Sequence, residues 1–174
     1  MKIIAFAGAL LVMAVAIPTA HACTSASAAY GDTRPREGLY VLDDAILHGV
    51  MTTTDSVIWF ATYADQGIAE AQYNLAVLYE RGDGVAKDEA KAIDLYRRAA
   101  EQKFPQAKFN LGVMHHLGVG TPQNHAEAAR LYRLAAGHGI AHAHFNLGLL
   151  YFEGKGVPRD ETEALRWCKS AASQ

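Results

Sequence analysis

The sequence predicts an all-α fold, an α-solenoid of antiparallel helix pairs, on three observations. One pattern occurs three times at a spacing of 36 residues, over 71–100, 107–136 and 143–172. Each copy contains two stretches with helical spacing of apolar residues, and a Gly-x-Gly loop separates them. A period of about 20–50 residues is typical of repeat proteins, whose units bury their apolar faces against neighbours. We therefore expect three full repeats, at about 67–102, 103–138 and 139–174.

Residues 1–22 have the features of a cleavable signal peptide. Lys2 precedes the apolar run Ile3–Ile17, and Ala20-His21-Ala22 fits a small-x-small cleavage signal. The run is shorter than the ~20 residues that a membrane-spanning helix needs. Cys23 would follow the cut, but the residues before it fit a lipoprotein signal poorly, so lipidation is the less favoured alternative. We expect a periplasmic or secreted protein.

A helical repeat domain is expected over 37–174, after a flexible lead-in of small and polar residues over 23–36. Its first part resembles an incomplete repeat. Gly38–His48 keeps leucines at first-helix positions but lacks the glycine loop, whereas Ser56–Gln66 matches the second helix of a repeat. In that match, Phe60 stands 36 residues before a tyrosine of the first full repeat. We interpret this part as a degenerate N-terminal helical cap.

The first helix of each repeat, helix A, is predicted from an apolar stripe. In the first copy Ala71, Leu75, Leu78 and Tyr79 recur at helical spacing before a glycine loop. Glycine is favoured just past a helix because the chain there adopts a positive φ. The glycines recur in every copy and are therefore structural positions of the repeat: Gly82, Gly84, Gly118, Gly120, Gly154 and Gly156.

The second helix, helix B, is predicted to begin after Asp88, Asn124 and Asp160, whose side chains can cap free backbone N–H groups. Its buried stripe contains Tyr96, at a position where the third copy has Cys168. Cys168 is therefore expected to be a buried free thiol. Because the chain has two cysteines, at most one bridge could form, and a disulfide framework is excluded.

The motif A-x-A-Q-Y-N-L-A-x-L-Y-x-x-G-x-G-V, followed by a cap and A-x-x-L-Y-R-R-A-A, resembles the Sel-one-like repeats (SLR), relatives of the tetratricopeptide repeat. The resemblance covers about 67–174. It implies a right-handed superhelix whose concave side is lined by helix A and which binds other proteins. One secreted branch of the family carries a disulfide in each repeat and is linked to β-lactam binding or hydrolysis, but no repeat of this sequence contains a cysteine pair. The Ser-x-x-Lys and Lys-Thr-Gly elements of the ordinary serine β-lactamases are absent as well.

If that arrangement holds, a second face of helix A lines the groove and could anchor an extended or helical partner. Packing between adjacent repeats is an equally good interpretation for the aromatic residues that begin each set. Divergence at the last position of each set favours a heterogeneous groove. The candidate partner-binding residues are Tyr73, Val77, Glu80, Phe109, Val113, His116, Phe145, Leu149 and Phe152.

Three polar features have simpler interpretations than a site. The ladder Asn74, Asn110 and Asn146 is expected to satisfy neighbouring polar groups rather than a ligand. The basic residues of helix B are expected on a solvated outer face, where Arg130 and Arg166 each follow a glutamate by three residues and can pair with it. The second and third copies are rich in histidine, but neither HExxH nor a Cys/His spacing occurs, so no metal site is expected. These histidines are His115, His116, His125, His138, His142 and His144.

The sequence thus predicts an exported, non-enzymatic scaffold that binds a protein or peptide of the cell envelope. No catalytic residue, cofactor or nucleic-acid partner is expected, since the net charge is −2 with both signs mixed. After cleavage we expect no integral membrane segment. The alternative is a cell-wall-related or β-lactam-binding or β-lactam-hydrolysing enzyme of the secreted branch. Self-association through the uncapped C-terminal repeat is a further possibility.

Overall fold

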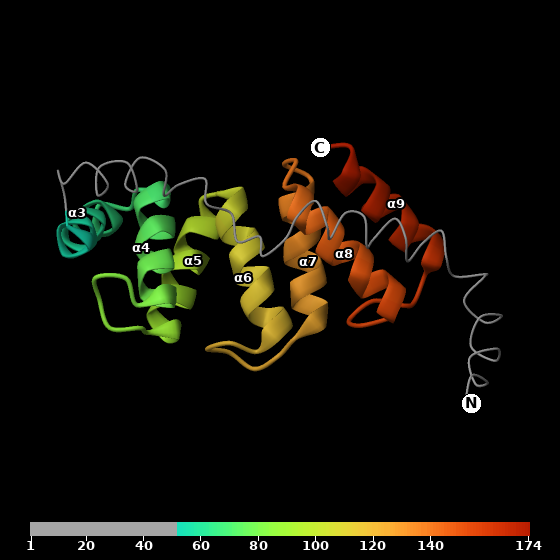
Figure 1. Cartoon of the computed structure of the whole chain (residues 1–174), viewed down its shortest axis with the longest axis horizontal. Coiled ribbons are helices and arrows are strands. Elements are labelled where there is room, and N and C mark those ends of the chain that lie inside the picture. The colour runs from blue at the N-terminus through green and yellow to red at the C-terminus, as the bar shows by residue number, and fades with distance from the viewer. Residues whose placement is uncertain (1–51) are drawn as a thin grey trace, which may run out of the picture.

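The computed structural model describes residues 52–174, and these form seven α-helices and no strand. The signal peptide, the lead-in and the Gly38–His48 stretch predicted above lie outside the described residues. The helices follow one another along the long axis of the molecule (Figure 1). They are α3 (Thr53–Asp65), α4 (Ala69–Arg81), α5 (Glu89–Glu101), α6 (Pro105–Leu117), α7 (His125–Ala136), α8 (Ala141–Glu153) and α9 (Glu161–Ala172).

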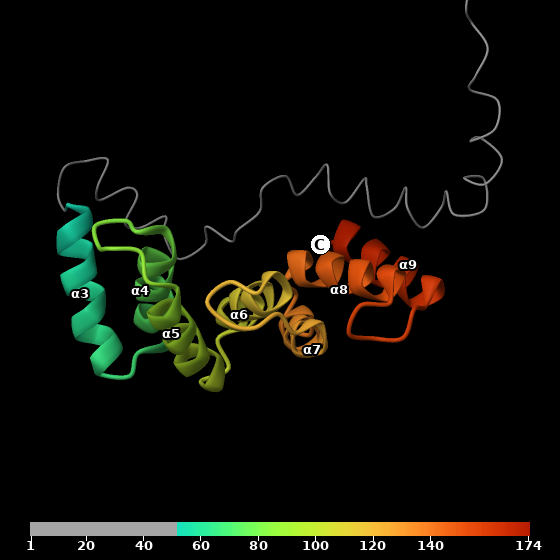
Figure 2. The same cartoon turned by 90° about the horizontal axis from the view of Figure 1, so that it is seen from below.

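The predicted helix pairs are confirmed. Helix A of the three repeats is α4, α6 and α8, which begin 36 residues apart, and helix B is α5, α7 and α9. The main contacts join helices that are consecutive in the chain, both within a repeat and from helix B of one repeat to helix A of the next. Figure 2 shows the same order from a second direction. Such an arrangement is an α-solenoid, and α3 occupies the place of a helix B before the first repeat.

The predicted N-caps of helix B are confirmed. Asp88, Asn124 and Asp160 each accept a hydrogen bond, 3.0 Å long, from the backbone N–H three residues later. Helix α3 begins at Thr53, three residues before the predicted Ser56. The reason is Thr52, whose hydroxyl accepts from the Asp55 N–H at 3.1 Å while the Asp55 carboxylate accepts from the Thr52 N–H at 3.0 Å. Thr52 lies 36 residues before Asp88 and has the same capping role.

The two glycines of each loop have different roles. Gly82, like its copies, ends helix A in the left-handed region at φ 80°. Gly84, at φ 69°, also leaves no room for a side chain, since a Cβ there would lie 2.6 Å from the Thr53 backbone. The same close approach joins Gly120 to Glu89 and Gly156 to His125. Each loop therefore rests on the first residue of the preceding helix B, α3 included.

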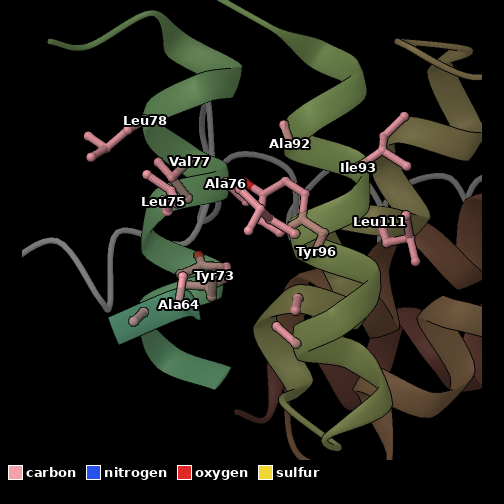
Figure 3. Packing of buried hydrophobic residues seen from close by; sticks show 14 of the residues in the cluster. Ala64, Tyr73, Leu75, Ala76, Val77, Leu78, Ala92, Ile93, Tyr96 and Leu111 are labelled. Atoms are coloured by element: carbon pink, nitrogen blue, oxygen red, sulfur yellow. The ribbon is translucent and has the colours of Figure 1, made fainter. Parts of the chain in front are cut away.

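The core lies between successive helices and follows the repeat. Figure 3 shows part of it, where the side chain of Tyr96 extends from α5 toward α4. The ring centroids of Tyr73 in α4 and Tyr96 lie 5.7 Å apart. Ala92 and Ala99 of α5 are fully buried, because their small side chains let adjacent helices approach closely. The apolar stripes predicted for helix A and helix B are thus confirmed.

The prediction of a free thiol at Cys168 is wrong. Cys168 is fully buried in α9, and its sulfur belongs to a disulfide. The chain contains one other cysteine, Cys23, which lies outside the described residues. The 36-residue alignment correctly placed Cys168 in the core, but a buried position does not by itself keep a thiol reduced.

Candidate functional site

The predicted partner-binding residues divide into buried and partly exposed groups. Tyr73, Val77 and Phe109 are buried, with 4% or less of each residue exposed. The ring centroids of Tyr73 and Phe104 lie 5.2 Å apart, and those of Phe109 and His142 lie 5.9 Å apart. Phe104 and His142 each lie where the following repeat begins. Packing between adjacent repeats, the alternative noted above, therefore describes these aromatic residues.

The other six candidates are partly exposed. Glu80 and His116 make polar contacts described below, and Val113 lies on α6. Phe145, Leu149 and Phe152 lie at positions i, i+4 and i+7 of α8, a spacing that places them on one face of the helix. All three are half-buried and lie outside the buried core cluster of this part of the chain. We call these three residues the α8 stripe.

Glu80 contacts the next helix rather than standing free in the groove. The Tyr96 hydroxyl donates to Glu80 Oε2 at 2.8 Å, and Asn110 Nδ2 donates to the same hydroxyl at 2.9 Å. Tyr96 is fully buried, and burial together with the negative charge of Glu80 raises its pKa well above the ordinary range. These contacts link α4, α5 and α6, so that they join the first repeat to the second.

A related set of contacts joins the second repeat to the third. Asn146 lies beside the Tyr132 hydroxyl and acts on its pKa, and the same hydroxyl lies 3.4 Å from His116 Nδ1. Burial raises the pKa of Tyr132. Glu80 and His116 differ in sequence, yet each stands beside the buried tyrosine hydroxyl of its own repeat. The residue type at this position therefore also affects the contacts of a buried tyrosine hydroxyl, in addition to any role in the groove.

The asparagine ladder is structural where its contacts are defined. Asn110 donates a hydrogen bond to Tyr96 of the preceding repeat, and Asn146 lies beside the equivalent Tyr132. At Asn74 the preceding helix carries Phe60, which has no hydroxyl, and the buried Oδ1 atom of Asn74 has no hydrogen-bond partner. Our sequence interpretation treated the tyrosines as core residues and missed the role of their hydroxyls. The available signal was that a buried tyrosine usually bonds its hydroxyl to a partner, and an asparagine recurs beside each one.

Two histidines lie close together at the joint between repeats two and three. The rings of His116 and His125 are 5.2 Å apart and nearly perpendicular. Burial, and then the neighbouring His125, lower the pKa of His116, while Glu153 and Lys155 act on it in opposite directions. Within residues 52–174 no group of three or more histidine, cysteine or carboxylate side chains could hold a metal ion. The pair therefore offers at most a partial set of ligands.

The ion pairs predicted on helix B are present. Arg130 donates two hydrogen bonds to the Glu127 carboxylate, at 2.8 and 2.7 Å. Arg166 donates one hydrogen bond to Glu163. Both arginines are exposed. Such pairs contribute little to stability at an exposed surface, and the face is solvated as predicted. Among the helices of residues 52–174, none combines the length and apolar character needed to cross a membrane.

Comparison with known proteins agrees with this geometry. A family model described as Sel1 repeat matches residues 69–104, 105–140 and 141–174. A Sel1 repeat protein from Oxalobacter formigenes is 37% identical with a TM-score of 0.68, over 70% of this chain and 49% of that one. The crystal structure of c5321, described as a protective antigen present in uropathogenic Escherichia coli strains displaying an SLR fold, is 39% identical with a TM-score of 0.66. That match covers 68% of this chain and 25% of the other.

The chain thus spans less than half the length of either solved structure. No curated protein matches it.

Proposed function

This chain belongs to the Sel1 repeat family, and we propose that it is a non-catalytic scaffold that binds a protein or peptide partner of the cell envelope. The binding surface is the exposed part of the helix A face. It consists of the α8 stripe together with Val113 and His116, with Glu80 at its far edge. Tyr73, Val77 and Phe109 support this surface from the core.

The observation that supports this proposal most strongly is the α8 stripe. Three large apolar side chains share one face of one helix, are partly exposed and lie outside the buried core cluster. Contiguous exposed apolar residues are typical of protein interaction sites, and aromatic residues often supply most of the binding energy. Val113 stands 36 residues before Leu149 and is the equivalent half-buried residue of α6, where it packs against the buried core cluster. An apolar stripe of this kind suits the apolar face of a partner segment.

Export is the second part of the proposal. Disulfides persist in oxidising compartments such as the bacterial periplasm and are rare in the cytosol. The disulfide at Cys168 therefore supports the export indicated by residues 1–22. Sequencing the N-terminus of the purified protein tests this part, with Cys23 expected as the first residue. An N-terminus that retains the leader would overturn it.

Site-specific photo-crosslinking in cells tests the binding surface. A photoreactive amino acid replaces Leu149 in the full chain, and a matched variant carries it at Leu134. Leu134 is also an exposed leucine, but it lies on helix B, with 41% of the residue exposed. We expect a discrete adduct from position 149 and none from position 134. Adding Phe145→Ala and Phe152→Ala should remove the adduct, with circular dichroism used to confirm that the helices persist.

Equal adducts from positions 149 and 134 would contradict the proposed surface. No adduct from position 149, with the protein exported and folded, would contradict it as well.

A further inference from the structure

Two histidines meet at the joint between the second and third repeats, although they come from different helices. His116 lies near the end of α6 and His125 is the first residue of α7, and their ring centroids are 5.2 Å apart. Imidazole nitrogens are preferred ligands of Zn²⁺, Cu²⁺ and Ni²⁺. We propose that His116 and His125 together bind one divalent transition-metal ion. This site does not depend on the function proposed above.

The separation of the two rings fits a shared ion. An imidazole nitrogen binds Zn²⁺ at about 2.0–2.1 Å, which puts the ion about 3.2 Å from the ring centre, so two rings at a tetrahedral angle have centres roughly 5 Å apart. The observed separation of the ring centroids is 5.2 Å. Both rings are therefore within reach of one ion without a change in the distance between them.

The contacts around the rings indicate which nitrogens bind the ion. His116 Nδ1 lies 3.4 Å from the Tyr132 hydroxyl, which leaves Nε2 for the ion. Metal-binding histidines usually hold their other ring nitrogen against a second group in this way, and that group orients the ring. The Nδ1 atom of His125 is buried and has no hydrogen-bond partner among residues 52–174. A bound ion would provide the partner that this atom lacks.

The backbone that carries the two histidines is held in place on both sides. Within the loop that joins α6 to α7 (Figure 1), Gln123 Nε2 donates a hydrogen bond to the His116 carbonyl oxygen at 2.8 Å. The glycine loop of the third repeat packs against the His125 backbone, where Gly156 leaves no room for a Cβ. A site that is already ordered loses little conformational entropy when it binds a ligand.

The charges around His116 are compatible with an ion at neutral pH. Burial, and then the neighbouring His125, lower the pKa of His116, Glu153 raises it and Lys155 lowers it. A metal ion binds the neutral form of imidazole, so a lowered pKa weakens the competition from protons. Glu153 is paired with Lys155 at 3.0 Å, and its negative charge favours a cation nearby.

Two protein ligands make this an open, exchangeable site. Within the described residues no group of three or more histidine, cysteine or carboxylate side chains could hold a metal ion. Structural zinc sites have four protein ligands and catalytic ones have three, so an ion held by two histidines retains water at its other positions. Because His116 belongs to the proposed binding surface, those positions are also open to a side chain of a partner if that function is correct.

Isothermal titration calorimetry of the full exported chain, purified without a polyhistidine tag, tests the site. ZnCl2 and MgCl2 are titrated at pH ~7.5, above the ordinary histidine pKa. We expect one Zn²⁺ per chain and no binding of Mg²⁺, which prefers oxygen ligands. His116→Gln and His125→Gln should each lower the affinity for Zn²⁺ by about tenfold or more, since losing even a group that orients a ligand costs about 10–100-fold. His138→Gln removes an exposed histidine elsewhere and should leave the affinity unchanged.

Nuclear magnetic resonance of the histidine side chains in the unaltered chain gives a second measurement that needs no variant. Zn²⁺ should shift the ring nitrogens of His116 and His125 and leave those of His138 in place. No binding of Zn²⁺, an affinity that both glutamine variants retain, or shifts confined to other histidines would each overturn the site. A missing adduct in the crosslinking experiment would contradict the proposed function alone, because the titration contains no partner.

Discussion

Asn110 of the second repeat donates a hydrogen bond, 2.9 Å long, to the Tyr96 hydroxyl of the first. Both residues are buried, so the bond forms away from water, where an unmade hydrogen bond is costly. The same hydroxyl donates to Glu80. Tyr96 of α5 therefore connects α4 and α6. Hydrogen bonds of its hydroxyl, as well as apolar packing, hold the first repeat against the second.

Replacing Tyr96 with phenylalanine tests how much the two hydrogen bonds of its hydroxyl contribute to stability. Phe60 already fills the equivalent position of α3, so the ring itself is compatible with the fold. The change leaves the buried Asn110 without its acceptor, and we expect it to lower the free energy of unfolding by about 1–3 kcal/mol. Chemical denaturation gives the value.

Tyr151→Phe is the matched control for that experiment. The Tyr151 hydroxyl accepts a hydrogen bond from Arg133 at 2.9 Å, but this bond is exposed to water. We expect a change within about 0.5 kcal/mol. If the two substitutions lower the free energy of unfolding equally, the buried hydrogen bonds of Tyr96 contribute no more than an ordinary surface hydrogen bond.

Substituting glycines separates the effects of conformation and close packing. Gly67 and Gly156 both have positive φ, at 85° and 70°, but a Cβ at Gly67 would meet nothing within 4 Å. Gly67→Ala should cost about 1–2 kcal/mol, which is the strain of a left-handed conformation. Gly156→Ala should cost clearly more, because the loop must also move off His125. Comparable melting temperatures for the two variants would argue against the packing role.

Leu111 tests the helix A register. It is 5% exposed and belongs to the buried cluster, whereas Leu117 on the same helix is 62% exposed. We expect Leu111→Ala to lower stability by about 2–5 kcal/mol, because it removes buried methyl groups and leaves a cavity. Leu117→Ala should change it by no more than about 0.5 kcal/mol. Thermal unfolding of the pair provides the comparison, and a reversed order would mean that the register is wrong.

The buried histidines predict how stability depends on pH. Burial lowers the pKa values of His116 and His144 in the folded chain below the ordinary value of 6.5. The unfolded chain therefore binds more protons in this range, so stability is complete above pH ~6.5 and falls as the pH drops below it. The pKa values of Asp88 and Glu127 are also lowered, by hydrogen bonds from the Lys91 backbone N–H and the Arg130 side chain, so both carboxylates stay ionised in this window.

Denaturation at pH ~7.5 and pH ~5.5 measures this dependence, since those values lie on either side of the ordinary histidine pKa. The double variant His116→Gln and His144→Gln should lose most of the difference. Glutamine is compatible with the buried position of His144, because Gln72 occupies it in the first repeat. A dependence that survives in the double variant would have to come from other histidines.

Most of the fold could be predicted from the sequence, because the positions that specify it recur every 36 residues. The helix B caps and the left-handed glycines are local features that depend on a few neighbouring residues, and they were correct. Helix α3 begins three residues before the predicted Ser56, because the side chains and backbone N–H groups of Thr52 and Asp55 form a capping box there.

The candidate site was less predictable, since exposure depends on what the next repeat covers. Tyr73 and Phe145 are equivalent in sequence, but Tyr73 packs against Phe104 and is 1% exposed, whereas Phe145 is half-buried. The oxidation state of Cys168 is likewise not determined by its position in the repeat, since Tyr96 and Tyr132 occupy the same position. The 36-residue period predicts the contacts that all repeats share. It does not predict exposure or oxidation state, because these depend on contacts that differ from one repeat to the next.

The contact between each glycine loop and the preceding helix B has a consequence for how the protein can change length. Gly84, Gly120 and Gly156 all rest on the first residue of a helix B, which is Thr53, Glu89 and His125 in turn. Backbone atoms provide much of this contact, so it tolerates three different side chains. Removing one complete 36-residue unit would bring Gly156 onto Glu89 and recreate a joint that Gly120 already makes. Deleting or duplicating one whole unit would therefore preserve this loop contact, whichever repeats become neighbours.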